Sequence, residues 1–305
     1  MVWRGPALAD LVEHGDGLLA VGDAGTLLEI RGEEVRALDA GTSADLRAAW
    51  SIADELWIGG ARGTLLRGRP GALAPIASPI EGDIEAIWGP GPDDVLLGGR
   101  GFLARWNGAA VELERRDARE AIWSIDGAGG EVLAAGSDLH RRQDGAWQAL
   151  DLTLPADLLD VDARSGWAVG ERGTLARRGA RGWALLQGGA GEAPSFYAVA
   201  SRGAAVVWAT SHGTLGLPSR RGWDEAALEP APYVAAILEG DSVIAVGGDA
   251  ILTLGPGGAR LERAPAALAG IARSSAGTFA VGAGASSSAT STAHGGASPS
   301  RCAAT

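Results

Sequence analysis

Cysteine, lysine and long hydrophobic runs are what this 305-residue chain lacks. Its single cysteine, Cys302, lies near the C-terminus, which excludes an intrachain disulfide and a multi-cysteine metal site. All 26 basic residues are arginine, and a coding bias toward GC-rich codons explains this most simply. No window approaches the length of apolar sequence that a membrane-spanning helix needs, so we expect no membrane insertion.

Positive charge is scarce as well. The formal net charge is −11 and the sequence pI is about 4.9, which argues against binding to nucleic acid or to an anionic lipid surface. The N-terminus shows no secretory signal, because Asp10, Glu13 and His14 interrupt the apolar run. The compartment stays open on this evidence, with the cytoplasm as the default expectation.

Glycine and short apolar runs are abundant, and they form a repeat. The chain has 48 glycines. In the stretch from Leu56 to Leu66, an apolar run ends at Gly60, a short polar turn follows, and a second apolar run returns. The segments Leu19–Leu28 and Trp167–Leu175 repeat this order. The pattern predicts a β-hairpin that recurs along the chain.

Eight copies of the unit recur at intervals of 35 to 40 residues. Each copy has room for four strands of about six residues with short turns, which favours an antiparallel meander. No copy has room for a crossover helix, so a parallel α/β sheet is excluded. The residues that we align at the end of the second strand are Gly22, Gly60, Gly98, Ala135, Gly170, Thr210, Gly247 and Gly282.

The third copy illustrates the predicted strands and turns. The pair Asn107-Gly108 is a strong hairpin signal, because both residues tolerate positive φ. Equivalent turns are expected at Asp144-Gly145 and at Arg181-Gly182. The strands expected in this copy are Ile84–Trp88, Val95–Leu97, Phe102–Trp106 and Ala110–Leu113, with a further turn at Gly98–Gly101.

Four-stranded antiparallel sheets that repeat around an axis form a β-propeller, which leaves only short protected edges. We therefore expect an all-β propeller over residues 1–283, with eight blades; seven is the alternative count. The eighth copy supplies only Leu268–Arg273 and Thr278–Val281, and Val2–Leu8 resembles a fourth strand. We expect the last blade to be incomplete and closed by this N-terminal strand. Residues 284–305 are rich in Ser, Ala, Thr and Gly and are expected to be a disordered tail.

Tryptophans recur at fixed positions in the copies. Large aromatic side chains at such positions are expected to fill the space between adjacent blades. Platforms on which a sugar ring stacks are the alternative interpretation. The residues concerned are Trp50, Trp88 and, nearby in the fourth copy, Trp123, together with Trp147, Trp183 and Trp223 of the fourth strands.

The glycine turns share the pattern apolar–Gly–x–x–Gly–Thr–apolar, followed by Gly–x–Trp or Gly–Trp. It occurs at Gly22–Thr26, Gly60–Thr64 and Gly170–Thr174, and in part at Thr210–Thr214. These repeats resemble those of BNR-type (Asp-box-like) β-propellers, particularly the photosystem II stability and assembly factor-like group. The resemblance covers about residues 7–282 and implies the propeller fold, since the motif is short and structural. A complete Asp box, Ser-x-Asp-x-Gly-x-Thr-Trp, is absent, and so are WD-repeat signatures.

Catalytic and cofactor motifs are not found. The Gly–x–x–Gly–Thr turns precede strands, whereas a phosphate-binding loop opens a helix. No Gly-x-Ser-x-Gly elbow occurs. The four histidines, His14, His140, His212 and His294, show no pair with ligand spacing. We therefore expect no cofactor, no metal and no catalytic residues, and a non-enzymatic role is favoured.

The connections between blades and the turns between second and third strands share one end of a propeller. Loops on a rigid scaffold are where binding residues concentrate, so we expect this face to bind a protein or peptide partner. A merely solvated face is the alternative, with Asp23, Asp138, Asp157 and Asp249 among its other charges. The candidate binding residues are Arg47, Arg62, Glu85, Arg100, Glu120, Arg172, Tyr197 and His212.

A second class of function remains open. A carbohydrate- or small-molecule-binding propeller, or a glycosidase or lyase, would place its site at the mouth of the central channel near Tyr197. Neither an Asp box nor a recognisable arginine triad supports a sialidase-like site.

Overall fold

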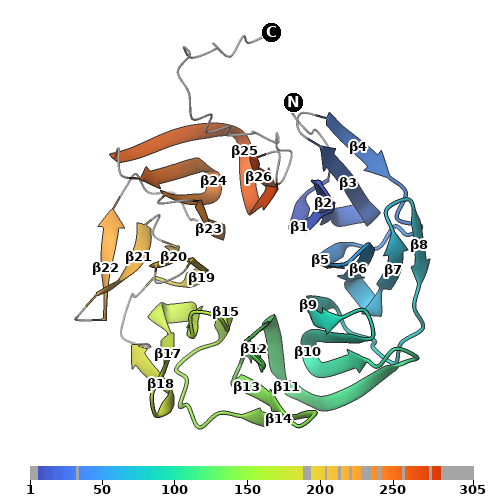
Figure 1. Cartoon of the computed structure of the whole chain (residues 1–305), viewed down its shortest axis with the longest axis horizontal. Helices are drawn as coiled ribbons and strands as arrows, with labels where there is room; N and C mark the ends of the chain where they lie inside the picture. Colours follow the sequence, from blue (N-terminus) through green and yellow to red (C-terminus); the bar gives the residue numbers. More distant parts are fainter. Residues whose placement is uncertain are drawn as a thin grey trace.

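A computed structural model describes residues 6–31, 34–187, 194–202, 205–211, 214–219, 222–227, 235–239, 242–255, 258–274 and 277–282. Over these residues the chain forms antiparallel strands and three short 3-10 segments. The sheets stand side by side around a central axis (Figure 1). The predicted all-β propeller of four-stranded antiparallel blades is thereby confirmed. Among the described residues, no helix is long and apolar enough to cross a membrane.

Four copies of the repeat form separate four-stranded sheets whose strands pair in chain order. Blade 1 consists of β1 (Leu8–His14), β2 (Gly17–Gly22), β3 (Thr26–Arg31) and β4 (Glu34–Leu38). Blade 2 consists of β5 (Leu46–Ile52), β6 (Glu55–Gly60), β7 (Leu65–Arg69) and β8 (Ala72–Pro75). Blade 5 consists of β15 (Leu158–Asp162), β16 (Trp167–Gly170), β17 (Leu175–Gly179) and β18 (Gly182–Gln187). Blade 6 consists of β19 (Phe196–Arg202), β20 (Ala205–Thr210), β21 (Thr214–Ser219) and β22 (Gly222–Ala227).

The third and fourth copies join into one six-stranded sheet. Its strands are β9 (Ile84–Gly91), β10 (Asp94–Trp106), β11 (Val111–Ala128), β12 (Glu131–Gly136), β13 (Leu139–Gln143) and β14 (Ala146–Ala149). A similar join gives the sheet of β23 (Ala235–Glu239), β24 (Ser242–Gly255), β25 (Gly258–Ser274) and β26 (Gly277–Gly282). We call the part of the large sheet up to Leu113 blade 3 and the part from Ala121 blade 4.

The predicted strand break at Gly98–Gly101 is wrong, because β10 runs through it. The first part of β10 pairs with β9, and the part from Arg100 pairs with β11. The connection after Leu113 stays extended alongside β10, with Phe102 opposite Arg116 and Arg100 opposite Ala121. This pairing merges the last strand of the third copy with the first strand of the fourth. The turns at Asn107-Gly108 and Asp144-Gly145 are confirmed, with positive φ at Gly108, Asp144 and Gly145.

The first strand of each copy lies innermost, around the axis (Figure 1). Successive innermost strands contact one another in the order β1, β5, β9, β11, β15, β19, β23, β25, and β25 and β26 contact β1, so the ring closes. The eight-blade count itself stays a prediction, because residues 1–5 and 283–305 lie outside the described residues. The predicted disordered tail lies there too. Leu8, which we placed in the closing strand, instead begins β1 and pairs with Gly22.

In blades 1, 2 and 5 a glycine ends the second strand, at a position where the backbone leaves no room for a side chain. A Cβ at Gly60 would lie 2.3 Å from the carbonyl oxygen of Asp45, and one at Gly170 would lie 2.1 Å from that of Asp157. In the third and fourth copies the equivalent residues are Gly99 and Gly136, opposite Ile84 and Ile122. Our alignment of Gly98 and Ala135 was therefore displaced by one residue.

The core lies between adjacent blades. Leu19, Val21 and Leu27 of blade 1 pack with Leu46 and Leu56 of blade 2. Trp57 of β6 is completely buried, and its ring lies 5.6 Å from that of Trp106 on β10. Figure 1 shows why this packing is required, since each sheet stands edge-on to the axis and presents both faces to its neighbours.

The predicted interblade tryptophans are found between blades 2 and 3. Trp50 of β5 and Trp88 of β9 have ring centroids 6.2 Å apart. Both are only partly buried. Trp88 also covers Gly127 of β11, where a Cβ would lie 2.4 Å from the indole.

We predict different costs for truncating these tryptophans. Trp57→Ala should lower the free energy of unfolding by about 3–5 kcal/mol, because a fully buried ring leaves a cavity. Trp88→Ala should cost only about 2 kcal/mol, because part of the ring already meets water. Urea unfolding followed by circular dichroism measures both, and equal losses for the two variants would contradict this packing.

Carboxylates on the innermost strands join neighbouring blades. Asp10 Oδ2 accepts a hydrogen bond from the Ala49 N–H at 2.9 Å, and Asp160 Oδ2 accepts one from the Val199 N–H at 2.9 Å. Asp126 Oδ2 accepts one from the Ala163 N–H at 2.8 Å. Burial raises the pKa of Asp10 and Asp126. Burial raises the pKa of Asp160 to about 6, although the Val199 and Ser124 hydrogen bonds oppose it.

The raised pKa of Asp160 predicts a pH-dependent stability. The ordinary pKa of an aspartate side chain is 3.8, so between about pH 4 and pH 6 the native state holds a proton that the unfolded state has lost. The contribution of this group to the free energy of unfolding therefore falls as the pH rises through that window. Asp160→Asn should reduce the difference between the urea midpoints at pH 4 and pH 7. The exposed Asp151→Asn is the control, and an unchanged difference in Asp160→Asn would contradict the assignment.

Candidate functional site

The loop face is the end of the propeller that carries two kinds of segment: the turns between the second and third strands of each blade, and the connections between blades. The pattern Gly–x–x–Gly–Thr builds its turns, which are the 3-10 segments η1 (Asp23–Gly25), η2 (Ala61–Gly63) and η3 (Glu171–Gly173). In η2, Arg62 and Gly63 have φ of 54° and 69°, and the Thr64 N–H donates to the Ala61 carbonyl. Two consecutive positive φ values define a type I′ hairpin turn.

The second glycine of each turn has positive φ, and so does the residue before it, which the sequence pattern does not mark. Ala24, Arg62 and Arg172 have φ of 54°, 54° and 50°. A left-handed conformation costs a residue with a side chain about 1–2 kcal/mol. The backbone N–H of each residue forms a hydrogen bond with the next blade, which offsets this cost.

These bonds anchor each turn on the following connection. The Ala24 N–H donates to Asp45 Oδ1 at 2.9 Å, and the Arg62 N–H donates to Asp83 Oδ1 at 2.9 Å. The Arg172 N–H donates to Ser195 Oγ at 3.3 Å. The predicted sharing of one face by turns and connections is therefore seen in the structure, and the face is held rigidly.

Arg47 and Glu85 meet at the inner edge of the loop face. Arg47 Nη2 lies 3.0 Å from Asp83 Oδ2, and Nη1 lies 3.8 Å from Glu85 Oε1. Burial raises the pKa of Glu85, and the positive charge of Arg47 opposes that shift. Two of the candidate residues thus form one charge cluster with Asp83.

Arg100 stacks on Trp123. Its guanidinium carbon lies 4.6 Å from the centre of the indole, and Trp123 Nε1 donates to Asp157 Oδ2 at 3.1 Å. Trp123 follows Ile122 as Arg47 follows Leu46, and both preceding residues lie opposite the glycine that ends the second strand. Trp123 therefore occupies the register of Arg47 and differs in register from Trp50 and Trp88, with which we grouped it.

Glu120 lies three residues before Trp123 and is not equivalent to Arg47 or Glu85. Arg115 holds its carboxylate, with Nε 2.6 Å from Oε2. His140 Nε2 lies 3.9 Å from the same carboxylate. Together with Asp138, these residues bring three ligand-type atoms within 4.8 Å of one another. A search for pairs of histidines misses such a group, since only one of its members is a histidine.

The remaining candidates are dispersed. Arg62 and Arg172 are exposed, and Arg172 Nη2 donates to the Pro155 carbonyl. Tyr197 on β19 is 38% exposed. His212 lies outside the described residues.

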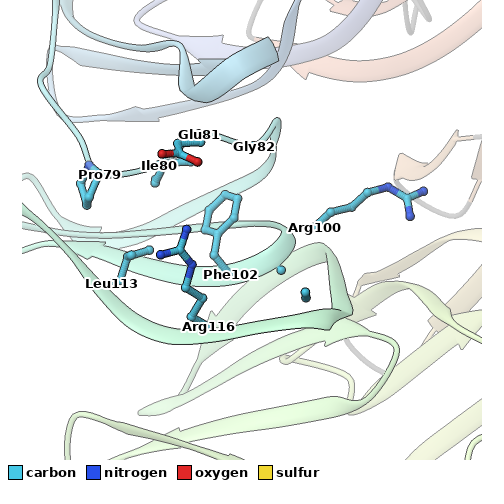
Figure 2. A pocket seen from close by; sticks show the side chains of 10 residues that line it. Pro79, Ile80, Glu81, Gly82, Arg100, Phe102, Leu113 and Arg116 are labelled. Atoms are coloured by element: carbon cyan, nitrogen blue, oxygen red, sulfur yellow. The ribbon is translucent and has the colours of Figure 1, made fainter.

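A pocket of about 260 Å³ opens on the loop face beside Arg100 (Figure 2). Ile80, Phe102 and Leu113 supply apolar surface, while Glu81, Arg100 and Arg116 supply charge. Figure 2 shows Arg116 beside Phe102 and extending toward Glu81, whereas Arg100 points away from them. Of this set, only Arg100 was among the predicted binding residues. Phe102 and Leu113 lie on strands of blade 3. Ile80 and Glu81 belong to the connection before blade 3 and Arg116 to the connection after it, and no motif marks either connection.

Comparison with known proteins supports the fold. No family model and no curated protein matches the sequence. The computationally designed protein Ika8 has a TM-score of 0.75 at 15% identity, over 93% of this chain and 96% of its own. YCF48 from Cyanidioschyzon merolae has a TM-score of 0.62 at 15% identity, over 93% and 98%. A structure of YCF48 bound to a D1 peptide has a TM-score of 0.60 at 18% identity, over 80% and 90%. At these identities the chain is similar to these proteins in fold, which agrees with the propeller group that its repeats resemble.

Proposed function

We propose that this protein is a non-catalytic propeller scaffold whose loop face binds a peptide segment of a partner protein. The observation that carries the proposal is the pocket of blade 3 (Figure 2). Buried Ile80 and Phe102 give it an apolar floor, and exposed Arg100 and Arg116 lie at its edge. An apolar floor with charged edges is typical of a site that anchors one side chain of a partner.

The size of the pocket favours a side chain over a whole small molecule. Its volume is about 260 Å³, below the range of about 300–1,000 Å³ that is usual for ligand pockets. The hollow of about 380 Å³ on the outer strands of blade 1 is a weaker candidate for a peptide site, because its charged side chains already pair with one another. Its lining residues Glu29, Arg31, Glu34 and Arg36 include ion pairs of Glu29 with both arginines.

Charge on the loop face indicates which peptides fit. Arg62, Arg100 and Arg172 form no ion pair with an acidic side chain in the described part of the chain. These side chains are exposed cations, although the net charge is −11. The proposed ligand is therefore an extended segment with an apolar residue beside aspartate or glutamate.

The YCF48 structure with a D1 peptide supports the proposal by analogy of fold. It is evidence that a propeller of this general shape presents a peptide site. The sequence pattern adds support, since the turns of this chain keep their backbone geometry while their side chains vary.

The carbohydrate-site alternative has less support. A sugar would stack on an aromatic face at the channel mouth, and the Trp123 ring there is covered by Arg100 at 4.6 Å. Tyr197 is exposed, but an exposed tyrosine alone does not supply the pair of carboxylates that most glycosidases use.

We predict that charge reversal on the loop face weakens peptide binding without unfolding the protein. The full chain is panned against displayed random peptides, and the affinity of enriched peptides is measured by fluorescence anisotropy. Replacing Arg62, Arg100 and Arg172 together by glutamate should weaken binding at least about tenfold, because opposite charges then become like charges. Arg116→Glu alone should also weaken it, by acting at the pocket edge.

The matched control replaces Arg69, Arg164 and Arg181 by glutamate. These exposed arginines lie at the opposite ends of the strands. The control should keep the affinity and the melting temperature of the parent. Equal losses in both triple variants, or enriched peptides without acidic residues, would contradict the proposal.

A further inference from the structure

We infer that Glu120, Asp138 and His140 form a binding site for a divalent transition-metal ion of the zinc class. The three residues come from β11, from the turn between β12 and β13, and from β13. Their ligand atoms lie within 4.8 Å of one another, and His140 Nε2 is 3.9 Å from Glu120 Oε2. Residues distant in the sequence therefore converge on one point where blades 3 and 4 meet.

The histidine supplies the independent observation. His140 is completely buried, and among the described residues neither of its ring nitrogens has a hydrogen-bond partner. Buried polar groups almost always have a partner, so an unpartnered imidazole requires an explanation. A metal ion bound to Nε2 would satisfy it.

The repeat shows that packing does not require a histidine here. His140 pairs with Ala134 on the neighbouring strand. The equivalent residues of other blades are Leu28, which pairs with Ala20, and Leu66, which pairs with Ile58. Both leucines are buried in the core. The fourth copy thus replaces an apolar core residue by a side chain that binds metal ions in proteins.

The local charge favours a cation. Two carboxylates face one cation, Arg115, which holds Glu120 through Nε and Nη2. Each carboxylate oxygen has a further lone pair, so Glu120 can keep Arg115 and bind a metal at the same time. Arg115 would then orient the carboxylate, as groups that contact metal ligands commonly do. A neutral imidazole is the form of histidine that binds a metal ion.

The donor set selects the class of metal. One imidazole and two carboxylates suit zinc and its neighbours, whereas calcium and magnesium prefer oxygen ligands alone. Zinc–ligand distances are about 2.0–2.2 Å, so the ligand atoms must draw together by about 1 Å on binding. Such an ion would tie the part of β11 around Glu120, which connects blades 3 and 4, to β13 of blade 4. It would thereby stabilise the joined sheet.

The test measures zinc binding by the full chain after treatment with a chelator. A competing fluorescent indicator should show one Zn²⁺ per chain, and Zn²⁺ should raise the melting temperature. An excess of Mg²⁺ should not compete. His140→Leu restores the side chain found at Leu66, so it should fold without metal but bind Zn²⁺ at least about 100-fold more weakly and lose the shift in melting temperature.

Two controls address the other zinc-binding groups. His14→Gln and Cys302→Ser should keep the affinity of the parent, since neither residue belongs to the site. Asp138→Asn should weaken binding while leaving the melting temperature of the metal-free protein near that of the parent. Absence of stoichiometric binding by the folded parent, or binding that His140→Leu retains, would overturn the inference.

Discussion

The hydrogen bond from a turn to the next blade is the interaction on which the rest of this structure depends. The Arg62 N–H donates to Asp83 and the Ala24 N–H donates to Asp45, so each turn is fixed by the blade that follows it. A single four-stranded sheet leaves both apolar faces uncovered, and only its neighbours can bury them. The bonds at the turns, together with those of Asp10 and Asp160 near the axis, set the spacing at which this burial occurs.

Because the backbone performs this anchoring, the side chains of the turns are free to serve another purpose. Arg62 and Arg172 contribute their N–H groups to the fold, while their side chains are exposed on the loop face, where Arg172 Nη2 also donates to the Pro155 carbonyl. The pocket beside Arg100 lies between the connection before blade 3 and the connection after it, and the second of these pairs with β10 (Figure 2). A rigid face with variable side chains is well suited to recognition of a peptide.

The sequence was sufficient to predict the propeller, because its period and its glycines reflect local requirements. Gly60 must lack a side chain where the Asp45 carbonyl approaches, and Gly63 must adopt positive φ. Errors arose where small residues are adjacent, since Gly98 and Gly99 are equally good matches to the pattern. That ambiguity shifted our alignment of the third and fourth copies by one residue. As a result, the register of Trp123, which matches that of Arg47, was not recognised. The pocket and the His140 cluster depend on contacts between copies, which no local pattern encodes.

Hydrogen exchange of the Arg62 amide tests the anchored turn most directly. The account predicts that this amide is protected in the parent, and that Asp83→Ala accelerates its exchange at least about tenfold. Asp83→Asn keeps an acceptor and should preserve the protection, while the Gly63 amide, which donates to Gly82, should stay protected in both variants. Exchange of the Arg62 amide at the rate of a free loop in the parent would contradict the account.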